Sequence, residues 1–137
     1  MSVAKWATPS TRSSNFASTA FDSLANGSES NTVTYDNSTN KDLYGLVTIK
    51  LGSITPTTGG SVTLRVTISD GTDTADRVDG ELYAFALTTT ASAKVAIKRI
   101  SLVGGFSLRF SLINNAGVAL ASSGNAIHVT PYNEDIV

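Results

Sequence analysis

The fold of this chain is decided by Ser61–Asp70, SVTLRVTISD, in which apolar and polar residues alternate strictly as far as Ser69. Successive side chains of a β-strand point to opposite faces, so this segment forms one dry face and one wet face. Val, Ile and Thr also suit a pleated, half-buried surface. Asp70-Gly71 supplies a turn at the end of the segment. The same alternation recurs along the chain and predicts an antiparallel β domain.

About eight such runs, bounded by turn-forming residues, predict short strands, and no segment predicts a helix. The expected strands are 32–35, 43–51, 61–69, 81–88, 93–102, 106–112, 118–121 and 126–130. This spacing of turns fits a β-sandwich or jelly roll, or a small barrel. Because 137 residues suffice for one core, we expect an all-β, antiparallel, jelly-roll-like β-sandwich over residues 21–137.

Residues 1–20 are rich in Ser, Thr and Ala and contain Trp6 and Phe16 as isolated large side chains. This composition predicts an extended N-terminal arm or an irregular edge segment. A lone Trp on a polar arm usually docks on its own domain or on a neighbour. We therefore expect the arm to be docked, on its own domain or on a neighbour, rather than free.

Two of the expected strands depart from simple alternation. Residues 81–88 are apolar on both faces, which predicts a central strand or one half-buried under a neighbouring subunit. In the segment 93–102, apolar residues alternate up to Ile97 and then change parity at Ile100. A shift by one residue moves side chains to the other face unless the strand bulges. We therefore predict a bulge or bend near Lys98-Arg99.

The charge of the chain excludes some classes of partner. Net charge is −1, and charged residues make up 15% of the chain, below the roughly 25% typical of globular domains. The basic residues form only one loose cluster, at Lys94, Lys98, Arg99 and Arg109. Nucleic-acid binding requires a basic excess that releases phosphate counterions, so no nucleic acid is expected as a partner.

Other classes are excluded by what the sequence lacks. There is no cysteine, so disulfides, thiolate metal sites and cysteine nucleophiles are ruled out. The first residues lack the apolar core of a signal peptide. No run approaches the ~20 apolar residues of a membrane helix, and no membrane is expected as a partner.

No arrangement of residues predicts catalysis, so we expect no enzyme, no catalytic residue and no cofactor. His128 is the single histidine, and its place in a terminal strand predicts an outward-facing strand residue rather than a triad member. Asp70, Asp73 and Asp76 lie three residues apart in one loop. Carboxylates on a loop bind Ca²⁺ in some proteins, so these are weak metal candidates beside the simpler interpretation as a solvated turn.

Three tyrosines leave a further alternative open. Tyr35, Tyr44 and Tyr132 are expected to be exposed and would then offer a platform on which sugars stack. Tyrosines of this kind more often cover the edge of a core or a subunit interface.

Residues 23–45, SLANGSESNTVTYDNSTNKDLYG, carry a family resemblance, as does the C-terminal VTPYNEDIV at residues 129–137. Both segments resemble those of small structural proteins of tailed bacteriophage virions. The resemblance implies a component of the capsid, tail or tail fibres. It offers no catalytic residue to transfer.

Together these observations lead us to expect a capsid decoration, or cement, protein that binds the major capsid protein and stabilises the shell. It would act in the virion, assembled in the host cytoplasm, as a homo-oligomer such as the trimer common among proteins of this kind. The expected partner interface contains Trp6, Phe16 and Tyr132. The alternatives are a tail or fibre component, or a carbohydrate-binding β-sandwich module, that recognises glycans on the host surface.

Overall fold

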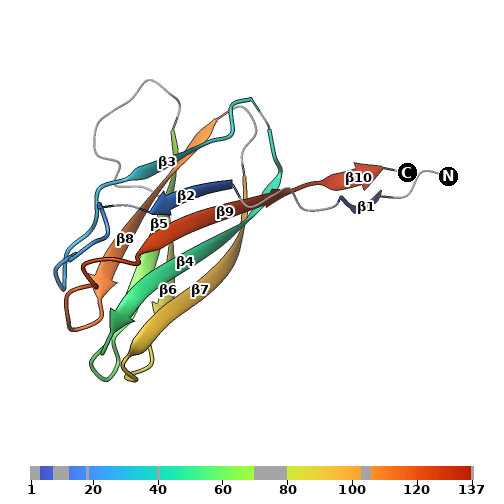
Figure 1. The fold of residues 1–137 in the computed structure, drawn as a ribbon. Helices are drawn as coiled ribbons and strands as arrows, with labels where there is room; N and C mark the ends of the chain where they lie inside the picture. Colours follow the sequence, from blue (N-terminus) through green and yellow to red (C-terminus); the bar gives the residue numbers. More distant parts are fainter. Residues whose placement is uncertain are drawn as a thin grey trace.

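The structure, a computed structural model, describes residues 4–7, 13–17, 19–39, 41–69, 80–102 and 106–136. All regular structure in these ranges is β-strand, and they contain no helix. Two four-stranded antiparallel sheets pack face to face, and a two-stranded ribbon extends from one end of them (Figure 1). The predicted all-β sandwich is confirmed.

The strand order identifies the sandwich as a jelly roll. The first sheet has the order β2 (Ser13–Ala17), β9 (Ala126–Tyr132), β4 (Tyr44–Ile54), β7 (Ser92–Ser101). The second has the order β3 (Val33–Asp36), β8 (Ser107–Asn115), β5 (Ser61–Ser69), β6 (Glu81–Ala86). The ribbon pairs β1 (Ala4–Trp6) with β10 (Glu134–Ile136). Strands β2 to β9 therefore pass from one four-stranded sheet to the other at every connection except that between β5 and β6, as in a jelly roll.

The segment that decides the fold lies inside the second sheet. Strand β5 pairs with both β6 and β8, and its alternate residues Val62, Leu64 and Val66 are buried. These side chains meet those from the inner face of the first sheet, among them Val47, Ile49 and Val129. The remaining large core residues include Phe21, Leu51, Leu108, Phe110, Leu112 and Ile127. These side chains form one continuous apolar layer between the sheets, because each sheet buries the alternate residues of its strands on its inner face.

The predicted bulge near Lys98-Arg99 is wrong. Strand β7 pairs with β4 in unbroken register from Tyr44↔Ser101 to Leu51↔Lys94, and the irregularity lies beyond that point, between Leu51 and Ile54. Gly52 is at that position, where a Cβ atom would lie 2.2 Å from the carbonyl oxygen of Ser123. Because β7 does not bulge, its change of parity moves the apolar residues to the outer face instead.

The prediction that strand 81–88 is central is also wrong. The strand ends at Ala86 and forms β6, which among the described strands pairs only with β5 and is an edge of the second sheet. Tyr83 and Phe85 pack partly against the core, whereas Leu82 on the other face is 54% exposed. Alternation in a sequence identifies the two faces of a strand but not its neighbours in the sheet.

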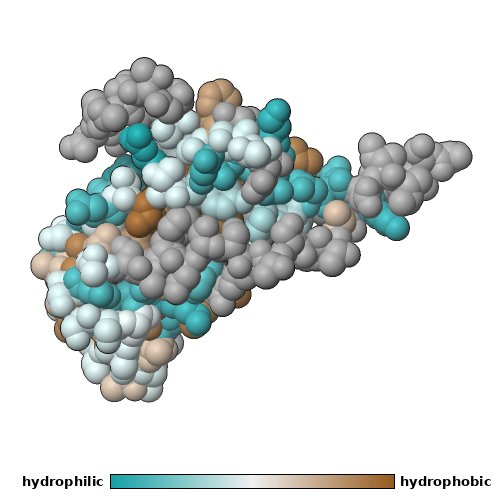
Figure 2. All heavy atoms as spheres, turned by 45° about the horizontal axis from the view of Figure 1, so that its top comes forward, coloured by the Kyte–Doolittle hydropathy of each residue, from teal (hydrophilic) through white to brown (hydrophobic). Residues whose placement is uncertain are grey.

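Two further segments differ from the expected boundaries. Residues 118–121 were expected as a strand but form none, although Leu120 is buried in the core and its N–H donates to the carbonyl of Leu24. Residues 13–17, within the segment expected as an arm or edge, form the edge strand β2 against β9. Figure 2 shows a surface that is mostly neutral or hydrophilic, with scattered hydrophobic residues.

Candidate partner interface

The most distinctive feature outside the sandwich is the ribbon formed by β1 and β10. Ala4, Lys5 and Trp6 pair with Ile136, Asp135 and Glu134, and no third described strand joins them. Figure 1 shows the ribbon projecting beyond the end of both sheets, as a continuation of β9. Both outer edges of the ribbon therefore lack a strand partner among the described residues, and such edges are templates for pairing with another chain.

The base of the ribbon is fixed to the sandwich by Asn133, between β9 and β10. Its side-chain N–H donates to Asp42 Oδ1 at 3.0 Å, and its side-chain oxygen accepts the N–H of Leu43 at 2.7 Å. Its backbone carbonyl accepts the N–H of Ala7 at 2.8 Å, which connects the other side of the ribbon. These bonds set the direction in which the ribbon leaves the body.

Asp42 is 6% exposed and belongs to a buried polar cluster. The hydroxyl of Tyr35 donates to Asp42 Oδ2 at 3.2 Å, and Asn37 exchanges two hydrogen bonds with the backbone of Asp42. The cluster joins the two segments that carry the family resemblance, residues 23–45 and 129–137. Buried polar groups are stabilised only when they are hydrogen-bonded. The hydrogen bonds of this cluster therefore hold the two segments together and position the ribbon.

An aromatic pair lies beside this base. The rings of Tyr44 and Tyr132 stack with centroids 5.4 Å apart and planes 20° apart. The hydroxyl of Tyr44 donates to a carboxylate oxygen of Glu134 in β10 at 3.4 Å. Since Tyr44 and Tyr132 are partners across β4 and β9, the stack continues the first sheet towards the ribbon.

The structure brings two of the three predicted interface residues to the same end of the molecule. Trp6 pairs through its backbone with Glu134 in the ribbon, two residues beyond Tyr132. Phe16 lies within the first sheet, opposite Ile127 on β9, and is separate from the ribbon. Sequence reasoning missed Asn133, and it named Tyr44 without placing it beside the ribbon, because their contacts join residues about 90 positions apart.

The expectation that Tyr35 is exposed is wrong. This side chain is 4% exposed and bonded to Asp42, whereas Tyr44 and Tyr132 are half-buried and stacked on each other. The three tyrosines thus do not form a flat platform, because one faces the interior and the other two cover each other's rings.

A shallow cavity of about 210 Å³ lies at the open side of the sandwich, between the edge strands β6 and β7. Its apolar lining includes Ile49, Leu51, Val62, Phe85 and Leu87. Among the described residues, no further strand covers this side of the sandwich, because β6 and β7 are the last strands of their sheets.

Two lysines of β7 point towards this open side. The ammonium group of Lys94 donates to Thr88 Oγ1, the carbonyl of Thr90 and Ser92 Oγ, at 2.6–2.9 Å. The ammonium group of Lys98 lies 4.8 Å from the ring centroid of Tyr83 on β6, within the range of a cation–π contact. The Tyr83 hydroxyl also bonds to Glu81, and this bond, with burial and the negative charge of Glu81, raises the pKa of Tyr83 to about 12.

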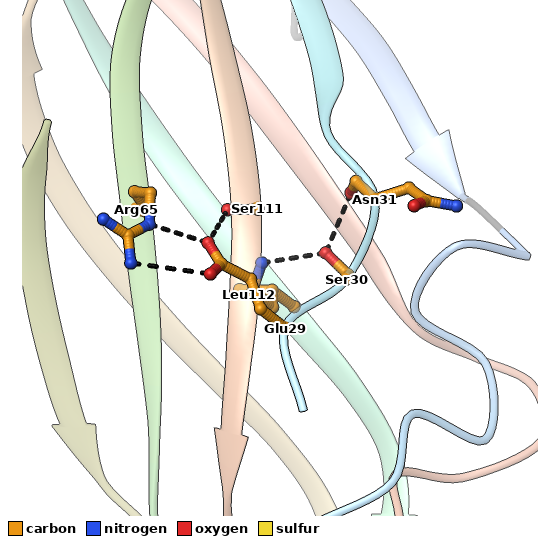
Figure 3. A network of polar contacts seen from close by, with 6 residues as sticks. All are labelled: Glu29, Ser30, Asn31, Arg65, Ser111 and Leu112. Carbon is orange, nitrogen blue, oxygen red and sulfur yellow. Dashed lines mark hydrogen bonds and ion pairs between the residues drawn. The ribbon is translucent and has the colours of Figure 1, made fainter. Parts of the chain in front are cut away.

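A polar network stabilises the outer face of the second sheet (Figure 3). The carboxylate of Glu29 accepts hydrogen bonds from Arg65 Nε at 2.7 Å and from the Ser111 hydroxyl at 2.7 Å. Beside it, the Ser30 hydroxyl accepts the N–H of Leu112 and donates to the carbonyl of Asn31. Burial raises the pKa of Glu29, but the bonds from Ser111 and Arg65 outweigh it and hold the pKa below its ordinary value.

The weak metal candidates Asp70, Asp73 and Asp76 lie outside the described residues. Within the part of the chain that is described, His, Asp and Glu side chains form no group of three that would hold a metal ion. His128 is half-buried between the fully buried Ile127 and Val129 of β9, so it faces outwards as predicted. No helix among the described residues is long and apolar enough to span a membrane.

Comparison with known proteins gives no family assignment. No family model matches the chain, and no curated protein matches it. One solved structure with a similar chain path is a family GH115 4-O-methyl-α-glucuronidase with specificity for decorated arabinogalactans, at 14% identity and a TM-score of 0.45. The match covers 80% of this chain but only 14% of that one.

Proposed function

We propose that this chain is a virion structural protein that binds and stabilises a capsid shell as a decoration protein. The observation that carries the proposal is the projecting ribbon of β1 and β10, which is fixed at its base and has two open edges. An isolated two-stranded ribbon is marginally stable in water. A ribbon in this position is best explained as an element that a partner completes by adding a strand.

The fold and the surface support the same proposal. Jelly rolls occur in viral capsid proteins and in lectins, although a fold alone does not define a function. The resemblance of residues 23–45 and 129–137 to structural proteins of tailed phages favours the virion over a free lectin. A surface with few charges suits close packing beside other subunits.

The major capsid protein is the proposed partner, and the virion the proposed location. We further propose that the chain acts as a homo-oligomer, such as a trimer. In such an assembly a neighbouring subunit would cover Leu82 on the outer face of β6, which is 54% exposed in the single chain.

Electron cryo-microscopy of virions from the phage that encodes the chain tests the proposal. We expect the jelly roll on the outer surface of the capsid, with β1 and β10 contacting the shell. A density confined to the tail or its fibres would contradict capsid decoration and favour the alternative of a tail component. Binding of the purified chain to a host glycan would then distinguish the carbohydrate-binding alternative.

A deletion of residues 2–7 tests the part that the ribbon plays. Because β1 lies outside the sandwich, the variant should fold with an unchanged β-sheet spectrum and still lose most of its occupancy on particles. Full occupancy with the fold intact would contradict the ribbon as the docking element.

A further inference from the structure

The outer face of β4 and β7 is the largest departure from normal burial in the sandwich. Val95 is 62% exposed, Ile97 is 60% exposed and Leu46 is 36% exposed. Ile97 pairs with Thr48, and Leu46 lies diagonally across from it, within reach of its side chain. We call these three residues the apolar patch.

The patch results from the orientation of β7, in which apolar side chains face outwards and lysines face the other sheet. On β7 the residues that face the other sheet include Lys94 and Lys98, while Val95 and Ile97 face outwards. The inward lysines contact the connection after β6 and the ring of Tyr83. Inward-pointing charges protect an edge strand from adding another strand. A partner would therefore bind β7 by its outer face rather than by its edge.

The charge around the patch indicates which partner fits. Lys50 is paired with Val95, and Arg99 with Leu46, so an exposed basic residue lies on each side. Of the four Lys and Arg residues in strands β2, β4, β7 and β9, Lys50 and Arg99 lie on this outer face, and these strands contain no Asp or Glu. Two copies of this face placed against each other would bring like charges together, which is unfavourable.

We infer that this face docks onto a different protein, at a surface where apolar side chains are flanked by carboxylates. The inference rests on the proposed function, because we place this complementary surface on the capsid shell protein. The apolar patch would lose its contact with water, and Lys50 and Arg99 would pair with the flanking acids. In this arrangement the ribbon and this face would both contact the shell.

Binding to capsids assembled without this protein tests the inference. The probe is a set of purified particles from a phage in which the gene is deleted. Ile97→Thr keeps a β-branched residue and removes apolar contact, and we expect it to weaken binding by about tenfold. Ile68→Thr is the matched control, the same substitution at an exposed residue of the other sheet (44% exposed), and should leave binding to the shell unchanged.

The charged residues give a second measurement. Arg99→Gln should weaken binding and make it less sensitive to salt than binding of the wild type. If the wild type binds the particles and Ile97→Thr binds them equally well, the docking face is overturned but the proposed function is not. Absence of wild-type binding would overturn the proposed function and this inference with it. Self-association in sedimentation velocity that Ile97→Thr abolishes would instead assign the face to a second copy of the chain.

Discussion

At the scale of single residues, Glu29 shows how an irregular segment is held on a sheet. Its backbone forms an isolated bridge with Ile113, and its carboxylate is bound by Arg65 and Ser111. The Glu29 side chain is 38% exposed and that of Arg65 is 23% exposed. Water therefore screens the ion pair, and its contribution to stability is modest.

Replacing Glu29 by Gln tests this contribution. We expect the free energy of unfolding at pH 7 to fall by about 0.5–1 kcal/mol, because the ion pair and a charged hydrogen bond are lost. Urea denaturation measures the change. Asn31→Asp is the control, since it alters charge on the same exposed segment without touching Arg65, and should change stability less.

The same residue makes stability depend on pH. The pKa of Glu29 in the folded protein lies below its ordinary value of 4.5, so the contribution of the carboxylate is present above that value. It is lost as the pH falls through the folded pKa. The wild type and Glu29→Gln should therefore converge in stability as the pH falls through the folded pKa of Glu29, which lies below 4.5. Parallel curves throughout the acid range would contradict this assignment.

Single residues also mark the limit of prediction from sequence. The outward position of His128 follows from alternation alone. The burial of Tyr35 does not, because it depends on Asp42 and Asn133, and Asn133 lies 91 residues away from Asp42. Contacts of this separation leave no periodic trace in the sequence.

At the scale of elements, strand β7 shows that an edge is protected by side chains that point inwards. Lys98 makes a cation–π contact with Tyr83, and this contact places its positive charge at the open side of the sandwich. Losing that charge leaves the edge of β7 open to pairing.

We expect Lys98→Met to aggregate faster on heating than the wild type, as measured by light scattering. Lys50→Met removes the same charge from β4, which is paired on both sides, and should not accelerate aggregation. Equal aggregation of the two variants would mean that net charge, rather than the edge, controls the behaviour.

The elements also separate what alternation predicts from what it does not. The alternation of residues 61–69 and 106–112 predicted strands correctly, although the buried face of β5 changes after Val66, where Thr67 is buried and Ile68 is 44% exposed. The order of strands in a sheet comes from long-range pairing, so alternation did not distinguish a central strand at 81–88 from one half-buried under a neighbouring subunit, and the structure rules out only the first. A change of parity has two outcomes, a bulge or an exposed apolar face, and β7 adopts the second.

At the scale of the whole molecule, the jelly roll separates a stable body from the ribbon. The first sheet is complete only when β2 pairs with β9, whereas among the described strands β1 pairs only with β10. Fold class followed from the pattern of short strands and turns. The projecting ribbon did not, because it pairs residues 4–6 with 134–136 outside any apolar pattern.

Two nested deletions measure where the stable body begins. Removing residues 2–7 should change the free energy of unfolding by less than about 1 kcal/mol, because an isolated ribbon adds little stability. Removing residues 2–17 also takes away β2 and uncovers the edge of β9, and should cost about 2 kcal/mol or more. Similar losses in urea denaturation of the two variants would contradict this boundary.

The hydrogen bonds of Asn133 have a consequence for the thermodynamics of docking. Because they hold the ribbon in one direction before any partner arrives, little conformational entropy remains to be lost when it binds. Such pre-organisation allows a small contact area to give useful affinity. Each copy would then bind the capsid lattice without a change of shape. Many weak, identical contacts between these copies and the shell would together give a stable coat.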